Sequence, residues 1–439
     1  MLHTVHLSPL TEKRLTDIVM LQMCLLRYAL FTEKIEETSC ADYLNRHKRF
    51  QGRGVKIARW LLDKQAPKRH EPLKRFGHCE GEQAAALRQK KRIWCKKLHR
   101  QVLALSWGKA IPLEKLYNQK SAPPWQHDAA EFLIHFYTDL CSEANFAGYF
   151  FSEPGAPKFG RQEFLKEFRD ANRDLYVCAF CDEAGYYTIV EQAIRSDIDH
   201  YFPKSIYPHF SCHPYNLIPT CKACNQVVKR EADPLDGLDG MRLGLGDVYL
   251  PYRSTGLDKA TYLSVQLEQA GEPVTWVHIG NLKPREQTDQ QIPRFIDTLS
   301  RVYDIPRRWS GQVDKIGETL FRRMRQFLGN GREAPFGFDM AAAVYNTLNQ
   351  LLYYLHDEDQ RRDPFAFAMT WILVALLNEE QRLLEQGHEP VTTEHSSFCY
   401  PLIWELVEGI GQNVDLNEER AHLAQSLLEV VRGDFLSEA

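Results

Sequence analysis

The stretches Cys178-Ala179-Phe180-Cys181 and Cys221-Lys222-Ala223-Cys224 are separated by 39 residues in a chain of 439 residues. Two Cys-x-x-Cys pairs in one short segment are typical of a zinc site, because four thiolates complete a tetrahedral shell around one zinc ion. The separation is longer than the roughly 15–20 residues that are common between such pairs. We therefore expect additional structure to be folded between the two halves of a four-cysteine zinc site.

The residues between and after the two cysteine pairs predict two short strands and a helix. Asp197–Tyr201 alternates polar and apolar residues, which indicates a half-buried strand that ends before Pro203. Asn216–Thr220 predicts a second, apolar strand. Cys221–Arg230 predicts a helix whose last turn holds cations, which suit the helix dipole there, and an Asp-Pro pair at 233–234 ends it.

The polar residues of this segment follow a known pattern. Asp199-His200, Asn216 and Asn225, framed by the four cysteines, resemble the motif of the HNH endonucleases, the ββα-metal nucleases. The resemblance is confined to the stretch from Tyr176 to Lys229. It implies that His200 is the general base that activates water and that Asp199 ligates a divalent cation. It further implies that Asn216 holds the loop so that His200 is aimed. Asn225 stands where the family often has histidine and would be the second metal ligand.

The chemistry of these side chains agrees with the implied roles. A neutral imidazole near pH 7 is a suitable proton acceptor for a water molecule. A cation held by one carboxylate and one amide oxygen keeps waters and open positions for phosphate, which favours Mg2+ or Mn2+. Lys204, Lys229 and Arg230 are nearby cations that could contact phosphate. They could equally be the solvated ends of a loop and a helix, and both interpretations stay open.

Each part of the pattern also has a structural interpretation when it is taken alone. An isolated Asp-His pair is usually structural or solvated, and an isolated asparagine is typical of turns. Four cysteines alone indicate a structural zinc site without chemistry. The joint pattern is what favours catalysis. Cys212 and His213 are also potential ligands, but we expect them to be loop residues because the two cysteine pairs already complete four-coordination.

Composition indicates a soluble globular protein with room for two or three domains. Eleven cysteines are an odd number, and four of them have zinc spacing, which favours a reducing compartment over a disulfide framework. The first ten residues lack the pattern of a secretory signal, and the longest apolar run, Phe365–Leu377, is too short to span a bilayer. We therefore predict a cytoplasmic protein without a membrane partner.

Charge is distributed unevenly along the chain. The net charge is −4, but residues 46–100 hold 18 Lys and Arg against 4 Asp and Glu, a local excess of +14 that leaves −18 for the remainder. Gln83–Leu105 predicts one basic helix, on which Lys90, Lys91 and Arg92 would point outward. The hypothesis is a surface that contacts nucleic-acid phosphates. The alternatives are a solvated cationic face and a docking surface for an acidic partner.

These patterns predict a mainly α protein with a small α+β nuclease module of the ββα-metal type, braced by a four-cysteine zinc site. The expected domains are a helical N-terminal region (1–150), the nuclease module (161–240) and a mostly helical C-terminal region (241–439). Within the last region, Tyr262–Leu267 and Val274–Ile279 predict a hairpin. Apolar helices are expected at three further places: Ala341–Leu355, Phe365–Leu384 and Glu418–Val431.

The expected function is that of a metal-dependent HNH endonuclease that hydrolyses phosphodiester bonds in DNA. The module resembles those of bacterial anti-phage defence systems, which implies a regulated effector with an ATPase or a sensor protein as a partner. A homo-oligomer is left open, because one site makes one cut per encounter. The alternatives are a zinc-braced nucleic-acid-binding or scaffold protein with an inactive site, and a nuclease that cleaves RNA.

Overall fold

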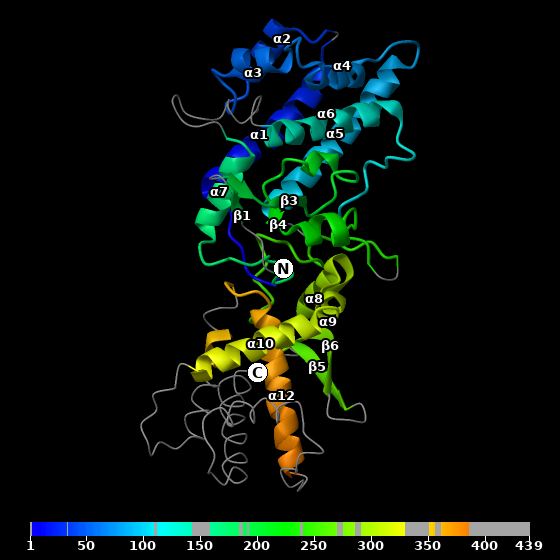
Figure 1. Cartoon of the computed structure of the whole chain (residues 1–439). Coiled ribbons are helices and arrows are strands. Elements are labelled where there is room, and N and C mark those ends of the chain that lie inside the picture. Colours follow the sequence, from blue (N-terminus) through cyan, green and yellow to red (C-terminus); the bar gives the residue numbers. More distant parts are fainter. Residues whose placement is uncertain are drawn as a thin grey trace. The chain divides into compact units, whose positions relative to one another are not determined.

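The computed structural model describes residues 2–32, 34–108, 112–142, 159–183, 188–190, 193–237, 240–269, 275–285, 291–329, 351–355 and 361–385. The chain forms two compact units. The first comprises residues 3–173 and 185–255, and the second comprises residues 174–184 and those from 256 onward. The described residues are mainly helical, with small two-stranded sheets, as the sequence predicts (Figure 1).

Helices build most of the first unit. They are α1 (Pro9–Ala29), α2 (Glu37–Asn45), α3 (Gly54–Leu61), η1 (Pro67–Arg69), α4 (Glu71–Gly77), α5 (Ala84–Trp107), α6 (Pro124–Cys141) and α7 (Arg161–Ala171). The predicted basic helix is α5, which ends where Gly108 adopts a left-handed φ of 62°. An aromatic cluster of Phe76, Trp94 and Trp125 joins α4, α5 and α6 in the core. Apolar stripes at helical spacing thus become the buried faces of these helices.

The described residues of the first unit also form four short strands. β1 (Thr188–Val190) pairs with β2 (Ala193–Arg195), a hairpin that the sequence does not signal. β3 (Asp197–His200) pairs antiparallel with β4 (Leu217–Thr220), and β4 leads into η4, a π-helix at Ala223–Lys229. The predicted order of strand, strand and helix is therefore confirmed. The loop between β3 and β4 carries a single 3-10 turn, η3 (Pro208–Phe210).

The predicted boundary between a helical region and a nuclease module does not coincide with a boundary between compact units. Residues 161–173 and 185–240 share their unit with the N-terminal helices. The loop after β3 packs on α6, where Ser211 Oγ donates to the Leu133 carbonyl at 2.9 Å. A two-stranded sheet buries too little apolar surface to be stable alone. Gln22 of α1 donates to the same Leu133 carbonyl at 2.7 Å, so α1, α6 and the loop after β3 meet at this point.

The second unit contains a hairpin and further helices. β5 (Thr261–Gln269) pairs antiparallel with β6 (Thr275–Pro284), which confirms the predicted hairpin. The helices are α8 (Gln291–Tyr303), α9 (Ile305–Ser310), α10 (Val313–Gly329) and α12 (Ala366–Glu385). α12 coincides with the predicted apolar helix at 365–384 and packs on β5, with the rings of Tyr262 and Trp371 5.7 Å apart. The helix predicted at 418–431 and most of the one at 341–355 lie outside the described residues.

The segment that carries the first cysteine pair is a tight turn within the second unit. The Asp182 amide donates to the Cys178 carbonyl at 2.9 Å, and Asp182 adopts a φ of 60°. Trp309 Nε1 donates to the Cys181 carbonyl at 3.0 Å. These contacts hold the backbone carbonyls of both cysteines within the turn.

A helix that crosses a bilayer has to be both long and apolar. Among the helices of the described ranges, none combines the two properties.

Candidate active site

His200 stands at the last position of β3, opposite Leu217 of β4. Its Nε2 lies 3.0 Å from the carbonyl oxygen of Ser211 in the loop that follows. A carbonyl only accepts hydrogen bonds, so Nε2 carries the proton and Nδ1 of the neutral ring is the acceptor. Within the described part of the chain, Nδ1 has no hydrogen-bond partner. The local geometry thus fixes the tautomer that a general base requires.

The surroundings of His200 keep its ring uncharged. The side chain is 8% exposed, and the Tyr137 ring of α6 meets it edge-on at 4.2 Å between centroids. Burial lowers the pKa of His200 to about 3, with the charge of Lys204 adding to the effect. The imidazole is therefore in its proton-accepting form at neutral pH.

Asn216 fastens the loop that runs from His200 to β4. This side chain is fully buried. Its Oδ1 accepts from the Phe202 amide at 2.6 Å, and its Nδ2 donates to the carbonyls of Phe202 and Phe210 at 3.1 and 3.0 Å. All three bonds reach the backbone of the loop that connects His200 to Ser211. They tie this loop together, and the role of Asn216 in aiming His200 stays a prediction.

We expect Asn216→Ala to lower the free energy of unfolding by about 3 kcal/mol, because three buried backbone groups lose their partner. Urea unfolding followed by circular dichroism measures the change. Asn118→Ala is the matched control, since Asn118 is exposed and its side chain bonds locally to the Lys120 amide. Equal stability of the two variants would contradict the assigned role of Asn216.

Asp199 and Lys229 form a buried ion pair, and this corrects one expectation. Lys229 Nζ lies 2.9 Å from Asp199 Oδ1 and donates to the His200 carbonyl at 2.7 Å. The two side chains are 2% and 1% exposed. Lys229 was expected to contact phosphate, but its ammonium group is buried beneath β3. The Asp199 carboxylate therefore accepts a charge-assisted hydrogen bond and is not exposed to solvent.

Asn225 is oriented by a residue that the sequence pattern did not indicate. Its Nδ2 donates to Asp197 Oδ2 at 3.2 Å, and Gln226 Nε2 donates to the same oxygen at 2.8 Å. In the described structure, the Asn225 Oδ1 atom accepts no hydrogen bond. Asp197 and Asp199 lie on one face of β3 because side chains alternate along a strand. The two-residue spacing of Asp197 and Asp199 in the sequence could have indicated that Asp197 belongs to the site.

His200, Asp199 and Asn225 meet at a pocket of about 410 Å3 in the first unit. It is lined by Tyr117, Gln119, Ile134, Tyr137, Ile198, Asp199, His200, Pro203, Lys204, Ser205, Asn225, Arg230 and Glu231. Lys204 Nζ lies 4.9 Å from the centre of the Tyr137 ring, and Arg230 is exposed at the end of η4. The structure therefore brings the predicted base, both predicted cation ligands and two predicted phosphate-binding cations to one place.

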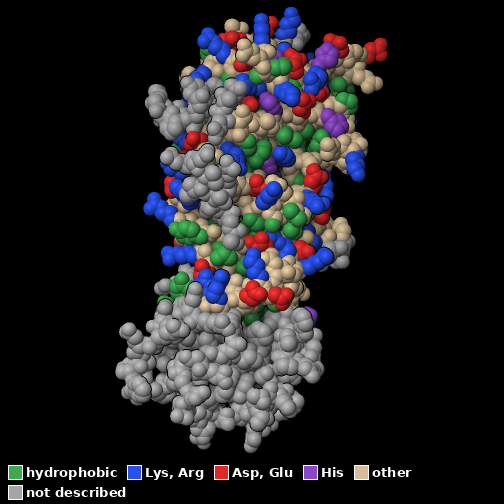
Figure 2. Space-filling model, in the orientation of Figure 1, with side chains coloured by type: hydrophobic (Ala, Val, Ile, Leu, Met, Phe, Trp, Pro, Cys, Tyr) green, Lys and Arg blue, Asp and Glu red, His purple; other side chains and the backbone are tan. Residues whose placement is uncertain are grey.

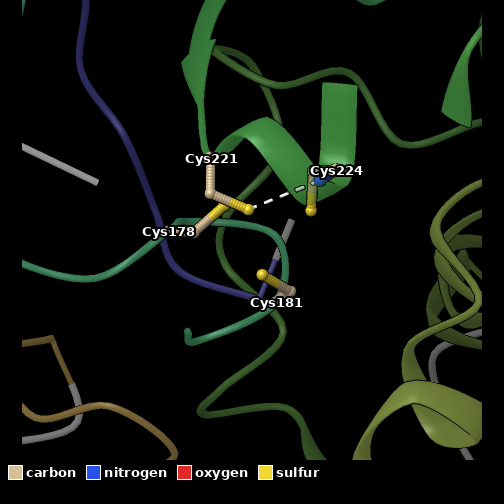
Figure 3. Close-up of side chains that lie close together, drawn as sticks. All are labelled: Cys178, Cys181, Cys221 and Cys224. Atoms are coloured by element: carbon tan, nitrogen blue, oxygen red, sulfur yellow. Dashed lines mark hydrogen bonds between the residues drawn. The ribbon is translucent and has the colours of Figure 1, made fainter. Parts of the chain in front are cut away.

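The four cysteines of the two pairs converge as well. All are buried, and their sulfur atoms lie within 4.8 Å of one another. Figure 3 shows the sulfurs facing a common centre, with the Cys224 amide 3.4 Å from Cys221 Sγ. Such a set can hold a metal ion such as zinc. Cys212 and His213 are outside this cluster, and His213 Nε2 instead lies 3.2 Å from the Val102 carbonyl.

The predicted basic surface on α5 requires a correction. Lys90 is exposed, but Lys91 is 1% exposed and donates to the carbonyls of Phe76 and His78. Burial lowers the pKa of Lys91. Arg92 is half-buried and stacks on the Phe31 ring at 4.6 Å. Of the three residues predicted to point outward, Lys91 faces the core.

Acidic residues from other segments offset the positive charge of residues 46–100. Arg69 pairs with Asp139 at 2.9 Å, and both side chains are buried. Further pairs join the segment to acids elsewhere in the first unit: Arg49–Asp17, Arg59–Glu37, Arg75–Asp128, Arg75–Glu131 and Lys97–Glu114. Basic and acidic side chains interleave on the face shown in Figure 2. Acidic residues that lie nearby in the folded structure therefore neutralise part of the positive charge of residues 46–100.

Comparison with known proteins gives a partial similarity. A stretch of 59 residues is 36% identical to protein ea31 of Escherichia phage lambda. It covers 13% of this chain and 17% of that protein, so the chain spans under one fifth of the relative it matches. No protein-family model and no solved structure matches the chain. The candidate site itself is therefore the basis for assigning a function.

Proposed function

We propose that this protein is a metal-dependent endonuclease of the HNH type that hydrolyses phosphodiester bonds in DNA. The observation that carries the proposal is the setting of His200. Its Nε2 is committed to the Ser211 carbonyl, its ring is neutral, and it shares one pocket with Asp199 and Asn225. A base with a fixed tautomer beside hard oxygen ligands suits the activation of water for attack on phosphorus.

The donor set of the pocket fits a hard divalent cation. Asp199 offers a carboxylate, and Asn225 offers an amide oxygen, since its bond to Asp197 uses only the amide nitrogen. Oxygen donors of this kind suit Mg2+ or Mn2+. When bound, such an ion supplies Lewis acidity at the phosphoryl oxygens and neutralises charge there. The soft thiolates of the four-cysteine cluster suit Zn2+, which we propose as a second, structural metal.

Residues of the chain itself supply the other functions of the site. His200 Nδ1 takes a proton from the attacking water, and Asn216 holds the loop that carries the Ser211 carbonyl. Lys204 and Arg230 line the pocket and are the cations proposed to contact phosphate there. Lys90 and Arg92 on α5 are proposed as phosphate contacts outside the pocket. A regulated role in anti-phage defence, with an ATPase or sensor protein as a partner, follows from the family resemblance.

The test is cleavage of supercoiled plasmid by the purified chain with Mg2+ or Mn2+, with and without EDTA. We expect nicked or linear DNA only when the divalent ion is free, because the site relies on a hard cation for charge neutralisation. A structured RNA added in equal amount decides between DNA and RNA. Binding without cleavage of either, repeated in the presence of candidate partner proteins, would favour the inactive scaffold instead.

A further inference from the structure

Lys229 is placed where a buried cation has a specific effect on the pocket. It is the last residue of η4 and is 1% exposed, yet its Nζ reaches Asp199 Oδ1 at 2.9 Å and the His200 carbonyl at 2.7 Å. Both partners belong to the end of β3. An ammonium group in this position holds the Asp199 carboxylate and the backbone of His200 in one arrangement.

The same ammonium group changes the charge that an incoming cation meets. Asp199 and Glu231 line the pocket together with Lys204 and Arg230, and their formal charges cancel. Asp197 behind Asn225 adds a negative charge, and Lys229 behind Asp199 adds a positive one. His200 is neutral. A pocket without net negative charge attracts a free divalent cation weakly, whereas a phosphodiester adds both negative charge and oxygen ligands.

We infer that Lys229 is a positioning residue: an internal counter-cation that holds Asp199 and keeps the affinity for a free divalent cation low until a phosphodiester enters the pocket. The inference rests on the proposed function. Because binding couplings are reciprocal, the cation must raise the affinity for the nucleic acid by the same factor as the nucleic acid raises the affinity for the cation. The pocket then binds its cation chiefly together with the substrate.

The experiment measures binding of Mn2+ by the electron paramagnetic resonance signal of the free ion, in the full-length His200→Ala protein, which prevents cleavage. The probe is a short duplex DNA oligonucleotide, and oligonucleotide without protein corrects for Mn2+ that the DNA binds. We expect Mn2+ to bind about tenfold tighter in the presence of the oligonucleotide. Equal Mn2+ affinity with and without oligonucleotide would overturn the inference, and this arm needs no change at Lys229.

Adding Lys229→Met removes the charge while keeping the length of the side chain. We expect Mn2+ alone to bind about tenfold tighter than in the parent, with the effect of the oligonucleotide reduced by the same factor. Lys229→Gln, which keeps a hydrogen-bond donor without charge, serves if the methionine variant does not fold. Lys229→Arg keeps the charge, and we expect it to bind Mn2+ as the parent does. Lys166→Met is the matched control, since Lys166 is exposed on α7.

Failure of the inference and failure of the proposed function give different results. If the unaltered chain cleaves plasmid but the Lys229 variants bind Mn2+ no more tightly than the Lys166 control, the inference is wrong and the function stands. If the unaltered chain cleaves neither DNA nor RNA and the oligonucleotide leaves Mn2+ binding unchanged, the proposed function and the inference both fall.

Discussion

Plasmid cleavage is expected to fall by about 10^2-fold when His200 is replaced by alanine, the lower end of the roughly 10^2–10^4-fold that general base catalysis contributes, because a base with a pKa of about 3 is a weak one. The remaining rate comes from binding and charge neutralisation, which the substitution leaves in place. The loss should appear in the rate of the chemical step and not in the affinity for DNA. Single-turnover cleavage, combined with equilibrium binding of a labelled duplex, separates the two quantities.

His209→Ala is the matched control for that loss. His209 lies in the same loop, is 1% exposed, and has a pKa that burial lowers to about 3, as it does for His200. It does not line the pocket. We expect this variant to lose stability but to keep its cleavage rate per folded molecule. Equal rates for the His200 and His209 variants would contradict the assignment of His200 as the base.

The dependence of cleavage on pH provides a second readout of the same assignment. A base with a pKa of about 3 is already unprotonated at pH 5, so His200 itself causes no loss of rate between pH 8 and pH 5. An exposed histidine, with an ordinary pKa near 6.5, would instead lose activity through this range. A rate that falls tenfold per unit below pH 6.5, while the protein stays folded, would show that a different group carries the proton.

The second large effect is expected at the cysteine cluster. Cys221→Ser removes one of four thiolates whose sulfurs lie within 4.8 Å of one another. We expect this variant to lose bound zinc and to lower the free energy of unfolding by on the order of 5 kcal/mol, because metal binding contributes directly to folding at such sites. Zinc content by mass spectrometry and thermal unfolding, with and without a chelator, measure both results.

Cys212→Ser distinguishes loss of zinc from loss of a buried thiol. Cys212 is fully buried but lies outside the cluster, and burial raises the pKa of its thiol well above the ordinary value. Its variant should keep a full zinc content. If the Cys221 variant retains zinc, or if the two variants lose it equally, the cluster is not the metal site.

Short-range patterns in the sequence predicted the elements that build the site. The alternation at 197–201, the apolar run at 216–220 and the helix after the second cysteine pair are all present. These signals depend on residues close in sequence, and propensity and spacing carry them. The hairpin of β1 and β2 was missed because each strand has only three residues, too few for an alternating pattern.

Positions of charged side chains were harder to predict, because burial depends on partners distant in sequence. Lys229 forms an ion pair with Asp199, thirty residues away in sequence, and Arg69 forms one with Asp139, seventy residues away. Lys91 did carry a usable signal: it precedes Trp94 by three residues and Leu98 by seven, which places it on the buried stripe of α5. The prediction that Lys91 points outward followed from its charge and disregarded its position on that stripe. The backbone carbonyls that receive its ammonium group have no signature in sequence.

The wide turn of η4 has a consequence for how this segment tolerates changes in length. The Arg230 amide bonds to the Asn225 carbonyl five residues earlier, 3.2 Å away, instead of four as in an α-helix. Losing one residue between them would restore the four-residue spacing of an α-helix, in which Lys229 would follow Asn225 by three positions instead of four. A single-codon deletion here would therefore change how the Lys229 ammonium group is presented to Asp199, although every remaining side chain keeps its identity.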